Sequence, residues 1–229
     1  MSRYEFLLLD ADNTLLDFDE NERVSIRNTF KHLGVPYSDE TLALYHDINI
    51  MYWSMLAEGR IEKDVLLYKR FETLYERIGI KADPVATEEF YREQLGMGCQ
   101  VVKGAMETCR ILKGRGYRLF VITNGVSVTQ RSRLKGSGLL PYIEDVFISD
   151  DIGINKPDRG FFDYVASHIA GFDPKKALVV GDALYSDIRG GVNFGLDTCW
   201  LNIYNENNTS DLKPTYTIQT IVELQNILE

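Results

Sequence analysis

Polar and charged side chains that could carry chemistry follow the apolar runs of this sequence, at the points where buried strands would end. They are Asp10, Asp12, Thr123, Asn124, Gly125, Lys156, Asp182 and Asp187. In an open parallel sheet, ligands bind outside the carboxyl ends of the strands. We therefore expect these residues to gather at one edge of a sheet and to form a single site.

The aspartates predict a divalent cation at this site. Asp10, Asp12 and Asp182 would repel one another if they stood together without a counter-ion. A hard cation with oxygen ligands removes this repulsion, and Mg²⁺ is the usual choice beside a phosphate group. A lone Asp-x-Asp string is mostly solvated surface, but here it directly follows an apolar run and is accompanied by the other residues in order.

Thr123, Asn124 and Gly125 predict a phosphate-binding turn. Thr123 offers a hydroxyl, and the backbone N–H groups of Asn124 and Gly125 precede a predicted helix, whose N-terminus favours anions. Asn-Gly is also common in turns without a ligand, so this prediction depends on the accompanying residues. Pro157 suits a first helical position and holds the residue before it, Lys156, in an extended conformation. We expect Lys156 to face the same strand edge.

These residue types suggest phosphoryl transfer through a covalent intermediate. Asp10 would attack phosphorus and form an aspartyl-phosphate. Mg²⁺ and Lys156 would neutralise the charge on the transferring group. Asp12 would donate a proton to the leaving alcohol and then take one from the water that hydrolyses the intermediate. The two neighbouring aspartates would thus serve as nucleophile and as acid/base.

The elements that must position this site indicate an α/β fold. Continuous apolar runs, typical of strands covered on both faces, alternate with helical patterns. The runs are 4–10, 117–123, 145–149, 177–182 and 197–202, with a short strand at 215–218. The helical stretches are 104–115, 127–137, 159–170 and 184–194, and Gly116, Gly138 and Gly195 stand where three of them should end. This alternation predicts a doubly wound, Rossmann-like parallel sheet.

One interval, from about 20 to 98, carries helical patterns in place of strands. They span 20–33, 39–57, 62–78 and 86–95. We therefore predict an α-helical cap inserted after the first strand. The expected domains are a catalytic core, 1–17 and 99–229, and a cap, 18–98, that determines substrate specificity.

The composition predicts a folded protein and limits its partners. The chain has 229 residues, of which 45% are hydrophobic, and a net charge of −9, which argues against a nucleic-acid polymer or an anionic membrane as main partner. No stretch is long enough to span a bilayer. Three cysteines without a Cys-x-x-Cys pair indicate free thiols. We expect a cytoplasmic protein that binds a small phosphorylated molecule; the sequence leaves monomer and homodimer open.

The strings "DADNT", "TNG", "NKPD" and "GDALYSD" resemble the four signatures of the haloacid dehalogenase-like hydrolase superfamily. Nearly the whole chain fits, including a helical cap after the first strand. The string "DADNTLLDFDENE" together with "TNG" is most similar to the cytoplasmic 5′-nucleotidases that act on pyrimidine nucleoside monophosphates. The resemblance therefore implies a magnesium-dependent phosphomonoester hydrolase whose substrate is a nucleoside monophosphate.

The resemblance also implies a role for each residue of the site. The implied catalytic residues are Asp10 as nucleophile and Asp12 as acid/base. The implied phosphate ligands are Thr123, Asn124 and Lys156. The implied ligands of Mg²⁺ are the Asp10 carboxylate, the Asp12 backbone carbonyl and Asp182, with Asp187 in support. The chain departs from the common pattern at Asn13, where glycine is usual, and at Ala183, where serine is usual.

Other functions on the same residues stay open at this point. A phosphatase or mutase for small sugar phosphates keeps both aspartates. In 2-haloacid dehalogenases of this superfamily the second aspartate is typically absent, so Asp12 favours phosphoester chemistry. A phospho-receiver signalling module also uses Asp, Thr, Lys and Mg²⁺, but the length, the helical insert and Asp12 argue against it. A non-catalytic interaction protein is disfavoured because all four motifs are intact.

Substrate selection is expected to fall to the cap. Tyr52 and Trp53 are neighbours in a predicted helix and point to different faces, which leaves one of them for the substrate. Phe18 and Asn21 lie in the predicted hinge after the first strand and are further candidate substrate contacts. Aromatic rings stack on nucleobases, although most rings of the cap are expected to lie in its core.

Overall fold

The computed structural model describes residues 3–228 and divides into two compact units. The first, here the core unit, consists of Met1–Phe18 and Cys99–Glu229. The second, here the insert unit, consists of Asp19–Gly98. The chain thus leaves the core unit once, forms the insert unit, and returns.

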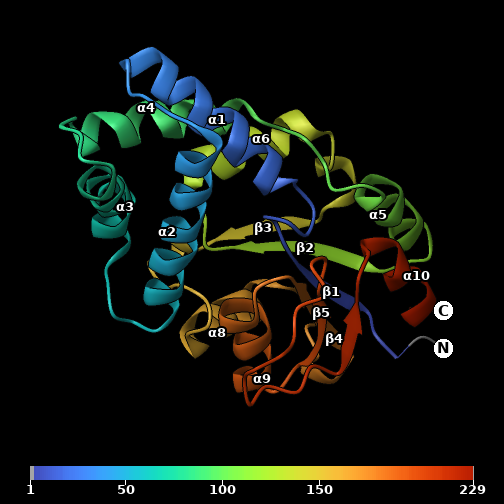
Figure 1. Cartoon of the computed structure of the whole chain (residues 1–229). Coiled ribbons are helices and arrows are strands. Elements are labelled where there is room, and N and C mark those ends of the chain that lie inside the picture. The colour runs from blue at the N-terminus through green and yellow to red at the C-terminus, as the bar shows by residue number, and fades with distance from the viewer. Residues whose placement is uncertain (1–2, 229) are drawn as a thin grey trace. The chain divides into compact units, whose positions relative to one another are not determined.

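The core unit is built on a six-stranded sheet (Figure 1). Its strands are β1 (Phe6–Asp10), β2 (Arg118–Thr123), β3 (Asp145–Ile148), β4 (Ala177–Gly181), β5 (Asp197–Leu201) and β6 (Tyr216–Ile218). They lie in the order β3-β2-β1-β4-β5-β6, and every neighbouring pair is parallel. Strands β1 and β4 are buried at every position, as expected of parallel strands covered on both faces. The predicted α/β fold with a Rossmann-like parallel sheet is confirmed.

Helices cover both faces of this sheet (Figure 1). The helices of the core unit are α5 (Ala105–Gly114), α6 (Ser127–Ser137), α7 (Ser149–Ile152), α8 (Arg159–His168), α9 (Arg189–Phe194) and α10 (Leu224–Ile227). Side chains alternate between faces along a strand, so Leu7 and Val121 pack with α5, α6 and α10. Phe6 and Phe120 pack on the opposite face with α8 and with the end of α9. The two apolar layers hold the strand ends in register.

Two local features of the core unit differ from the predictions. The predicted helix 184–194 is a π-helical turn, Leu184–Ile188, followed by α9. Helix α8 begins at Arg159 because Asp158 caps it by accepting from the Gly160 N–H at 2.7 Å. Pro157 therefore lies outside the helix, and its predicted place at the first helical position is wrong. Both segments contribute to the site.

The insert unit contains four helices. They are α1 (Phe18–Leu33), which begins at the last residue of the first core segment, α2 (Asp39–Ala57), α3 (Lys63–Ile78) and α4 (Pro84–Met97). Ser38 and Asp83 cap the N-termini of α2 and α4 with their side chains. The rings of Tyr45, Phe71 and Tyr91 pack together within this unit at centroid distances of 5.0 to 5.7 Å. Most of its aromatic content is therefore core.

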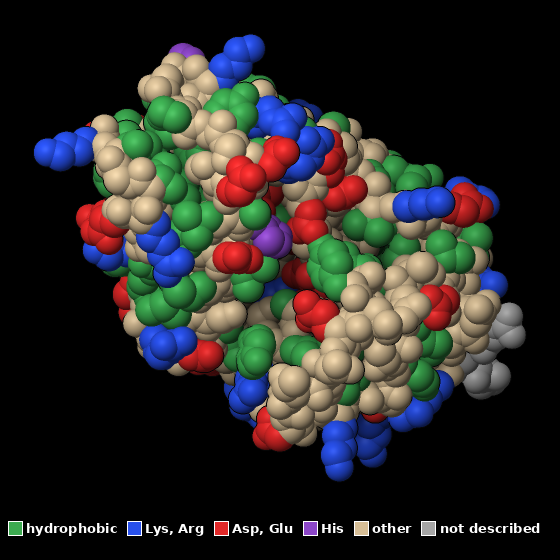
Figure 2. Space-filling view, viewed as in Figure 1, with side chains coloured by type: hydrophobic (Ala, Val, Ile, Leu, Met, Phe, Trp, Pro, Cys, Tyr) green, Lys and Arg blue, Asp and Glu red, His purple; other side chains and the backbone are tan. Residues whose placement is uncertain are grey.

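The surface carries charges of both signs. On the face shown in Figure 2, Lys and Arg side chains (blue) are interspersed with Asp and Glu side chains (red). The whole chain has 25 Lys and Arg against 34 Asp and Glu. A mixed face of this kind differs from the continuous basic stripe that binds a nucleic-acid backbone. Within residues 3–228, none of the helices has the length and apolar character needed to cross a membrane.

Candidate active site

The carboxyl ends of β1, β2 and β4 meet at one edge of the core sheet. Asp10 is the last residue of β1 and lies in register with Ile122 of β2, next to Thr123. Gly181 ends β4, and Asp182 follows it directly. Because β1 lies between β2 and β4, Asp10 stands between Thr123 and Asp182, as expected of a ligand site in an open parallel sheet.

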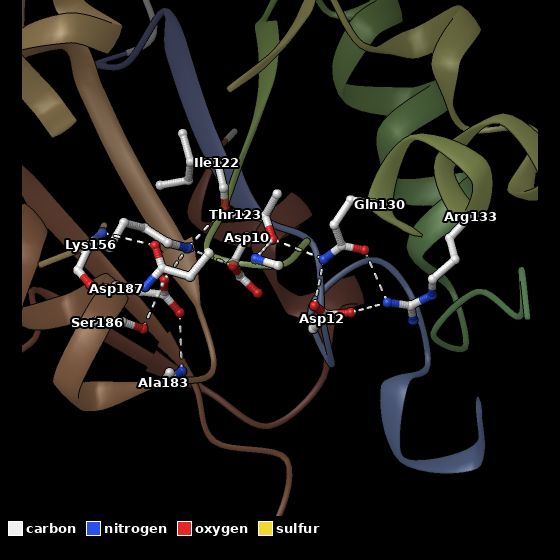
Figure 3. Close-up of polar contacts among 12 residues, drawn as sticks. Asp10, Asp12, Ile122, Thr123, Gln130, Arg133, Lys156, Ala183, Ser186 and Asp187 are labelled. Atoms are coloured by element: carbon white, nitrogen blue, oxygen red, sulfur yellow. Dashed lines mark hydrogen bonds and ion pairs between the residues drawn. The ribbon is translucent and has the colours of Figure 1, made fainter. Parts of the chain in front are cut away.

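Lys156 reaches this edge from the loop before α8 and is 1% exposed. Its ammonium donates to Asp10 Oδ1 at 2.6 Å, to Asp187 Oδ1 at 2.7 Å and to the Ile122 carbonyl at 2.9 Å (Figure 3). Burial alone would lower its pKa, but the charges of Asp10 and Asp187 outweigh burial and raise the pKa of Lys156. All three ammonium hydrogens have acceptors, so a phosphate oxygen would have to share or replace one of them.

Three carboxylates converge beside Lys156. One oxygen from each lies within 4.8 Å of the others, and the residues, here the acidic cluster, are Asp10, Asp182 and Asp187. Burial raises the pKa of Asp10 to about 8, because the opposing attraction of Lys156 does not compensate for it. Burial and then the charge of Asp10 raise the pKa of Asp182 well above its ordinary value. The acidic cluster therefore has less positive charge around it than its full ionisation requires.

The acidic cluster fits a hard divalent cation. Carboxylate oxygens are the ligands that Mg²⁺ takes, and a cation would supply the missing positive charge. Asp187 already accepts from Lys156 at Oδ1 and from the Ala183 N–H at Oδ2, at 3.1 Å. Asp10 and Asp182 are thus the members better placed to bind a cation directly, with Asp187 beside them in support.

Asp187 returns to the sheet edge because of the turn that follows β4. The π-helical turn Leu184–Ile188 holds it 0% exposed. A Cβ on Gly181 would lie 2.2 Å from Asp187 Oδ2, so only glycine lets this carboxylate reach the strand end. The indole N–H of Trp200 donates to the Asp182 carbonyl at 2.8 Å and fixes the start of the same turn. The spacing Gly-Asp-x₄-Asp therefore has a direct structural reason.

The Thr123 hydroxyl is oriented by two donors. It accepts from the Gly125 N–H at 3.1 Å and from Gln130 Nε2 at 2.9 Å. A hydroxyl has two lone pairs and one hydrogen, so these contacts leave its hydrogen to donate. A phosphate oxygen at the strand edge is a suitable acceptor for it.

The Asn124 side chain holds the loop that carries Lys156. Its Nδ2 donates to the Lys156 carbonyl and its Oδ1 accepts from the Lys156 N–H, both at 2.8 Å. This pair of hydrogen bonds fixes the loop that carries Lys156. The backbone N–H groups of Asn124 and Gly125, just before α6, remain the predicted phosphate ligands of this turn.

Asp12 turns toward α6 and away from the acidic cluster (Figure 3). Gln130 Nε2 donates to Asp12 Oδ2 at 2.6 Å, and Arg133 forms an ion pair with Asp12 Oδ1. Neither Gln130 nor Arg133 was predicted from the sequence as a site residue. Their signal is weak: two polar residues three positions apart share a helix face, and nothing in the sequence says that this face is buried against a strand end.

The turn after Asp12 explains one departure from the superfamily pattern. Asn13 has a φ of 54°, in the left-handed region that glycine adopts freely and asparagine tolerates. Its Oδ1 accepts from the Phe18 N–H at 3.1 Å. The Phe18 ring lies 5.7 Å from Arg133 Cζ, so this predicted substrate contact stands beside a partner of Asp12.

Asn21 was predicted to contact substrate, but the structure buries it within the insert unit. It is 2% exposed, and its Nδ2 donates to the carbonyls of Leu95 at 2.9 Å and Gly98 at 3.4 Å. A Cβ on Gly98 would lie 1.7 Å from Asn21 Oδ1. Asn21 therefore joins the two ends of the insert unit, which requires glycine at Gly98, and its side chain is not a proposed substrate contact.

The two predicted aromatic contacts in α2 lie in different surroundings. Tyr52 is 7% exposed, and its hydroxyl is 2.8 Å from Thr73 Oγ1 of α3, so it belongs to the packing between α2 and α3. Trp53 is half-buried, and its indole N–H donates to Asn49 Oδ1 at 3.1 Å. Of the two, Trp53 has the more accessible ring and stays the predicted substrate contact.

Comparison with known proteins agrees with this geometry. A family model described as haloacid dehalogenase-like hydrolase matches residues 4–195. The chain is 36% identical over 226 residues to pyrimidine 5′-nucleotidase PynA of Streptococcus pneumoniae, across 99% of this chain and 95% of the relative. It is 31% identical over 226 residues to pyrimidine 5′-nucleotidase YjjG of Escherichia coli, across 99% of this chain and 98% of the relative.

A solved structure extends the likeness to the backbone. The crystal structure of the HAD-hydrolase YfnB from Bacillus subtilis, bound to magnesium, matches with a TM-score of 0.95 and 38% sequence identity. The match covers 99% of each chain. The likeness therefore includes the whole of the described fold, the insert unit as well as the core unit.

Proposed function

This chain belongs to the haloacid dehalogenase-like hydrolases, and from that premise we propose that it is a Mg²⁺-dependent phosphomonoesterase that hydrolyses pyrimidine nucleoside 5′-monophosphates. One observation carries the proposal: the two neighbouring aspartates have separate partners. Asp10 pairs with Lys156 inside the acidic cluster, and Asp12 pairs with side chains of α6. Two carboxylates in different environments can take different roles, one as nucleophile and one as acid/base.

The first half of the proposed reaction phosphorylates Asp10. An oxygen of Asp10 attacks phosphorus while Lys156 holds the carboxylate and the Thr123 hydroxyl donates to a phosphate oxygen. The bond between phosphorus and the leaving oxygen breaks, its electron pair stays on that oxygen, and Asp12 donates a proton to it. The nucleoside leaves as a neutral alcohol, and Asp12 becomes a carboxylate.

The second half releases phosphate. Asp12 takes a proton from a water molecule whose oxygen attacks phosphorus. The bond between phosphorus and the Asp10 oxygen breaks, which restores both aspartates. When bound by Asp10 and Asp182, with Asp187 in support and the Asp12 backbone carbonyl as a further predicted ligand, Mg²⁺ supplies positive charge for the phosphate oxygens.

The substrate class is supported by the relatives and by the insert unit. PynA and YjjG are both named pyrimidine 5′-nucleotidases. We propose that the insert unit acts as the specificity cap, with Trp53 and Phe18 as the candidate rings for a nucleobase. The three cysteines are free thiols, which supports a reducing compartment such as the cytosol.

The test is a panel of phosphate esters, ranked by kcat/KM for phosphate release. UMP, CMP and dTMP are compared with AMP, GMP, uridine 3′-monophosphate and glucose 6-phosphate, each with Mg²⁺ and with excess EDTA. We expect the pyrimidine 5′-monophosphates to rank highest, and turnover to vanish with EDTA and to return with added Mg²⁺.

Each alternative has its own outcome in this panel. A higher kcat/KM for glucose 6-phosphate would make the chain a sugar phosphatase and remove the nucleotidase assignment. One phosphate incorporated per chain without further turnover would indicate a phospho-receiver. Full activity in EDTA would contradict the role of the acidic cluster as a metal site.

A further inference from the structure

Two residues of α6 surround the Asp12 carboxylate. Gln130 Nε2 donates to Asp12 Oδ2 at 2.6 Å, and Arg133 pairs with Asp12 Oδ1 (Figure 3). Arg133 Nη1 also donates to Gln130 Oε1 at 3.1 Å, so the amide and the guanidinium orient each other. Asp12 thus has a donor on each of its oxygens, and the two donors are linked.

Gln130 also connects Asp12 to the phosphate-binding turn. Its Nε2 lies 2.6 Å from Asp12 Oδ2 and 2.9 Å from Thr123 Oγ1. The contact depends on Gly125, because a Cβ there would lie 2.4 Å from Gln130 Nε2. One amide group therefore sets the distance between the proposed acid/base and the hydroxyl proposed to donate to the phosphate.

Burial indicates that this arrangement is specific. Gln130 and Arg133 are each 1% exposed, and removing a guanidinium from water is unfavourable unless a specific partner compensates for it. The Asp12 side chain, in contrast, is 29% exposed. The buried pair thus holds a carboxylate that still faces outward, which is what a group that exchanges protons with substrate and water requires.

We propose that Gln130 and Arg133 are positioning residues that hold Asp12 in place as the acid/base, apart from the acidic cluster and in register with Thr123. This inference deepens the proposed function and rests on it. Without the pair, the Asp12 carboxylate would lose both donors that turn it toward α6. It would then be free to move away from the leaving oxygen that it has to protonate.

The inference predicts a loss that depends on the leaving group. When the bond between phosphorus and oxygen breaks, a basic leaving oxygen needs a proton from Asp12, whereas a weakly basic one departs as an anion. Phenyl phosphate and p-nitrophenyl phosphate have nearly the same shape and differ in this property. A misplaced acid therefore slows phenyl phosphate selectively, because general-acid catalysis contributes roughly 10²–10⁴-fold.

The experiment measures kcat/KM for both esters with Mg²⁺ in the full chain, because kcat/KM reports only the steps up to departure of the leaving group, whereas kcat also includes hydrolysis of the intermediate. We expect Arg133→Gln to lower kcat/KM for phenyl phosphate on the order of 10²-fold and for p-nitrophenyl phosphate by less than about 5-fold. Gln130→Leu should show the same selectivity with a smaller loss of about 10-fold. The matched control is Arg131→Gln on the same helix, because Arg131 is 60% exposed and pairs with Asp151; it should leave both rates unchanged.

A double-mutant cycle separates positioning from general damage. If Arg133 acts through Asp12, then adding Arg133→Gln to Asp12→Asn should lower kcat/KM for phenyl phosphate by less than about 3-fold further, since residues that act as a unit are not additive. Thermal unfolding of every variant establishes that it is folded. Should Arg133→Gln not fold, Gln130→Leu takes its place in the same cycle.

Three results would overturn the inference. Equal losses on the two esters, or losses that multiply with Asp12→Asn, would leave Gln130 and Arg133 as structural residues only and would leave the proposed function intact. No turnover of either ester by the unmodified chain would overturn the proposed function and this inference together.

Discussion

The insert unit and the core unit each bury a group of charged side chains, and the two groups differ in charge balance. In the core unit, the three carboxylates of the acidic cluster share the positive charge of Lys156. In the insert unit, the buried carboxylates of Glu22 and Glu88 are matched by Arg70 and by His46. The first group therefore has excess negative charge, whereas the negative and positive charges of the second group nearly balance.

The group in the insert unit, here the insert network, runs through all four helices of that unit. His46 Nδ1 lies 2.6 Å from Glu22 Oε2, and Asn49 Nδ2 donates to Glu22 Oε1 at 2.6 Å. Arg70 then donates to Asn49 Oδ1 and to Glu88 Oε2, each at 2.6 Å. Glu22 lies on α1, His46 and Asn49 on α2, Arg70 on α3 and Glu88 on α4, so the network ties the helices together.

The comparison separates buried charge that stabilises from buried charge that reacts. A network in which each charge has a partner from another helix specifies packing. A cluster with excess charge of one sign costs stability unless a ligand compensates for it, and sites with shifted pKa values of this kind are often functional. Variants of the two groups test this distinction.

The largest effect is expected from Asp10→Asn in the acidic cluster. It removes the proposed nucleophile, so turnover should fall on the order of 10⁴-fold, equivalent to about 5.4 kcal/mol. The free energy of unfolding should stay the same or rise, because asparagine still offers Lys156 an acceptor and cannot take the negative charge that burial disfavours. Phosphate release and urea unfolding of the same preparation measure both quantities.

The matched control for Asp10→Asn is Asp163→Asn on α8, whose side chain is 58% exposed. This variant should keep wild-type turnover and stability. An Asp10→Asn protein that kept a tenth of the turnover would contradict the nucleophilic role, and one that lost several kcal/mol of stability would place Asp10 with the structural charges.

The next largest effect is expected from Arg70→Met in the insert network. Glu88 would lose its buried partner, and removing one member of a buried ion pair costs about 3–5 kcal/mol. Below the unfolding transition, kcat for p-nitrophenyl phosphate should change by less than about 3-fold, because Arg70 has no role in the proposed chemistry. Urea unfolding and steady-state rates at low temperature measure the two effects.

Two further variants sharpen this result. Arg77→Met changes an exposed arginine of the same helix and should alter stability by about 0.5 kcal/mol or less. Arg70→Met combined with Glu88→Met should recover much of the loss, because an apolar pair can replace a buried ion pair. A large fall in kcat with Arg70→Met alone would give the insert network a catalytic role. It would then no longer differ in function from the acidic cluster.

A third effect concerns Mg²⁺ and pH. The pKa of Asp10 is raised by burial to about 8 from an ordinary value of 3.8, so between these values the folded state without metal binds more protons than the unfolded state. The free energy of unfolding therefore falls as pH rises through this window. Bound Mg²⁺ opposes this fall, so the gain in Tm on adding Mg²⁺ should be larger at pH 8 than at pH 5.

At a concentration 100 times its Kd, Mg²⁺ should stabilise the chain by about 2.7 kcal/mol. Asp182→Asn removes a proposed ligand and should lose most of the gain in Tm. An equal gain at both pH values, or an undiminished gain in Asp182→Asn, would show that Mg²⁺ binds somewhere other than the acidic cluster.

The smallest effect is expected from His46 in the insert network. Its hydrogen bond to Glu22 raises the pKa of the imidazole, so the folded state holds this proton more tightly than the unfolded state. The contribution is fully present below the ordinary pKa of histidine and is lost as pH rises through the raised pKa. Because the side chain is 39% exposed, we expect about 0.5 kcal/mol or less.

Comparing wild type with His46→Gln in urea at pH 5.5 and pH 8.5 isolates this contribution. The difference between the two proteins should be larger at the lower pH. His32→Gln is the control, because the His32 ring stacks on the Phe90 ring, whereas the His46 ring is hydrogen-bonded to the Glu22 carboxylate. A difference that grew with pH would reverse the sign and contradict the ion pair with Glu22.

Much of the fold could be predicted from the sequence because apolar runs and helix-ending residues act locally. The predicted end of α6 at Gly138 and of α9 at Gly195 agrees with φ values of 77° and 90° at these glycines. The turn after β4 could not be predicted, because its π-helical geometry depends on Asp187 packing against Gly181. The pattern of apolar and polar residues does not predict that contact.

The candidate site also has features that could be predicted from the sequence and features that could not. The place of Asp10, Thr123 and Asp182 at one edge follows from their position at strand ends. The partners of Asp12 could not be predicted, since Gln130 and Arg133 reach it only through the rotation of α6 on the sheet. The burial of Asn21 could not be predicted, because it arises where the two ends of the insert unit meet around its side chain.

The sequence by itself determined which residue types stand at the carboxyl edge of the sheet, because parallel strands end on the same side whatever packs around them. Only the tertiary structure decided how these residues are paired. Lys156 pairs with Asp10 and Asp187, while Gln130 and Arg133 of α6 bind Asp12. Pairing depends on distances of a few ångströms between segments far apart in the chain, and those distances exist only once helices and strands have packed.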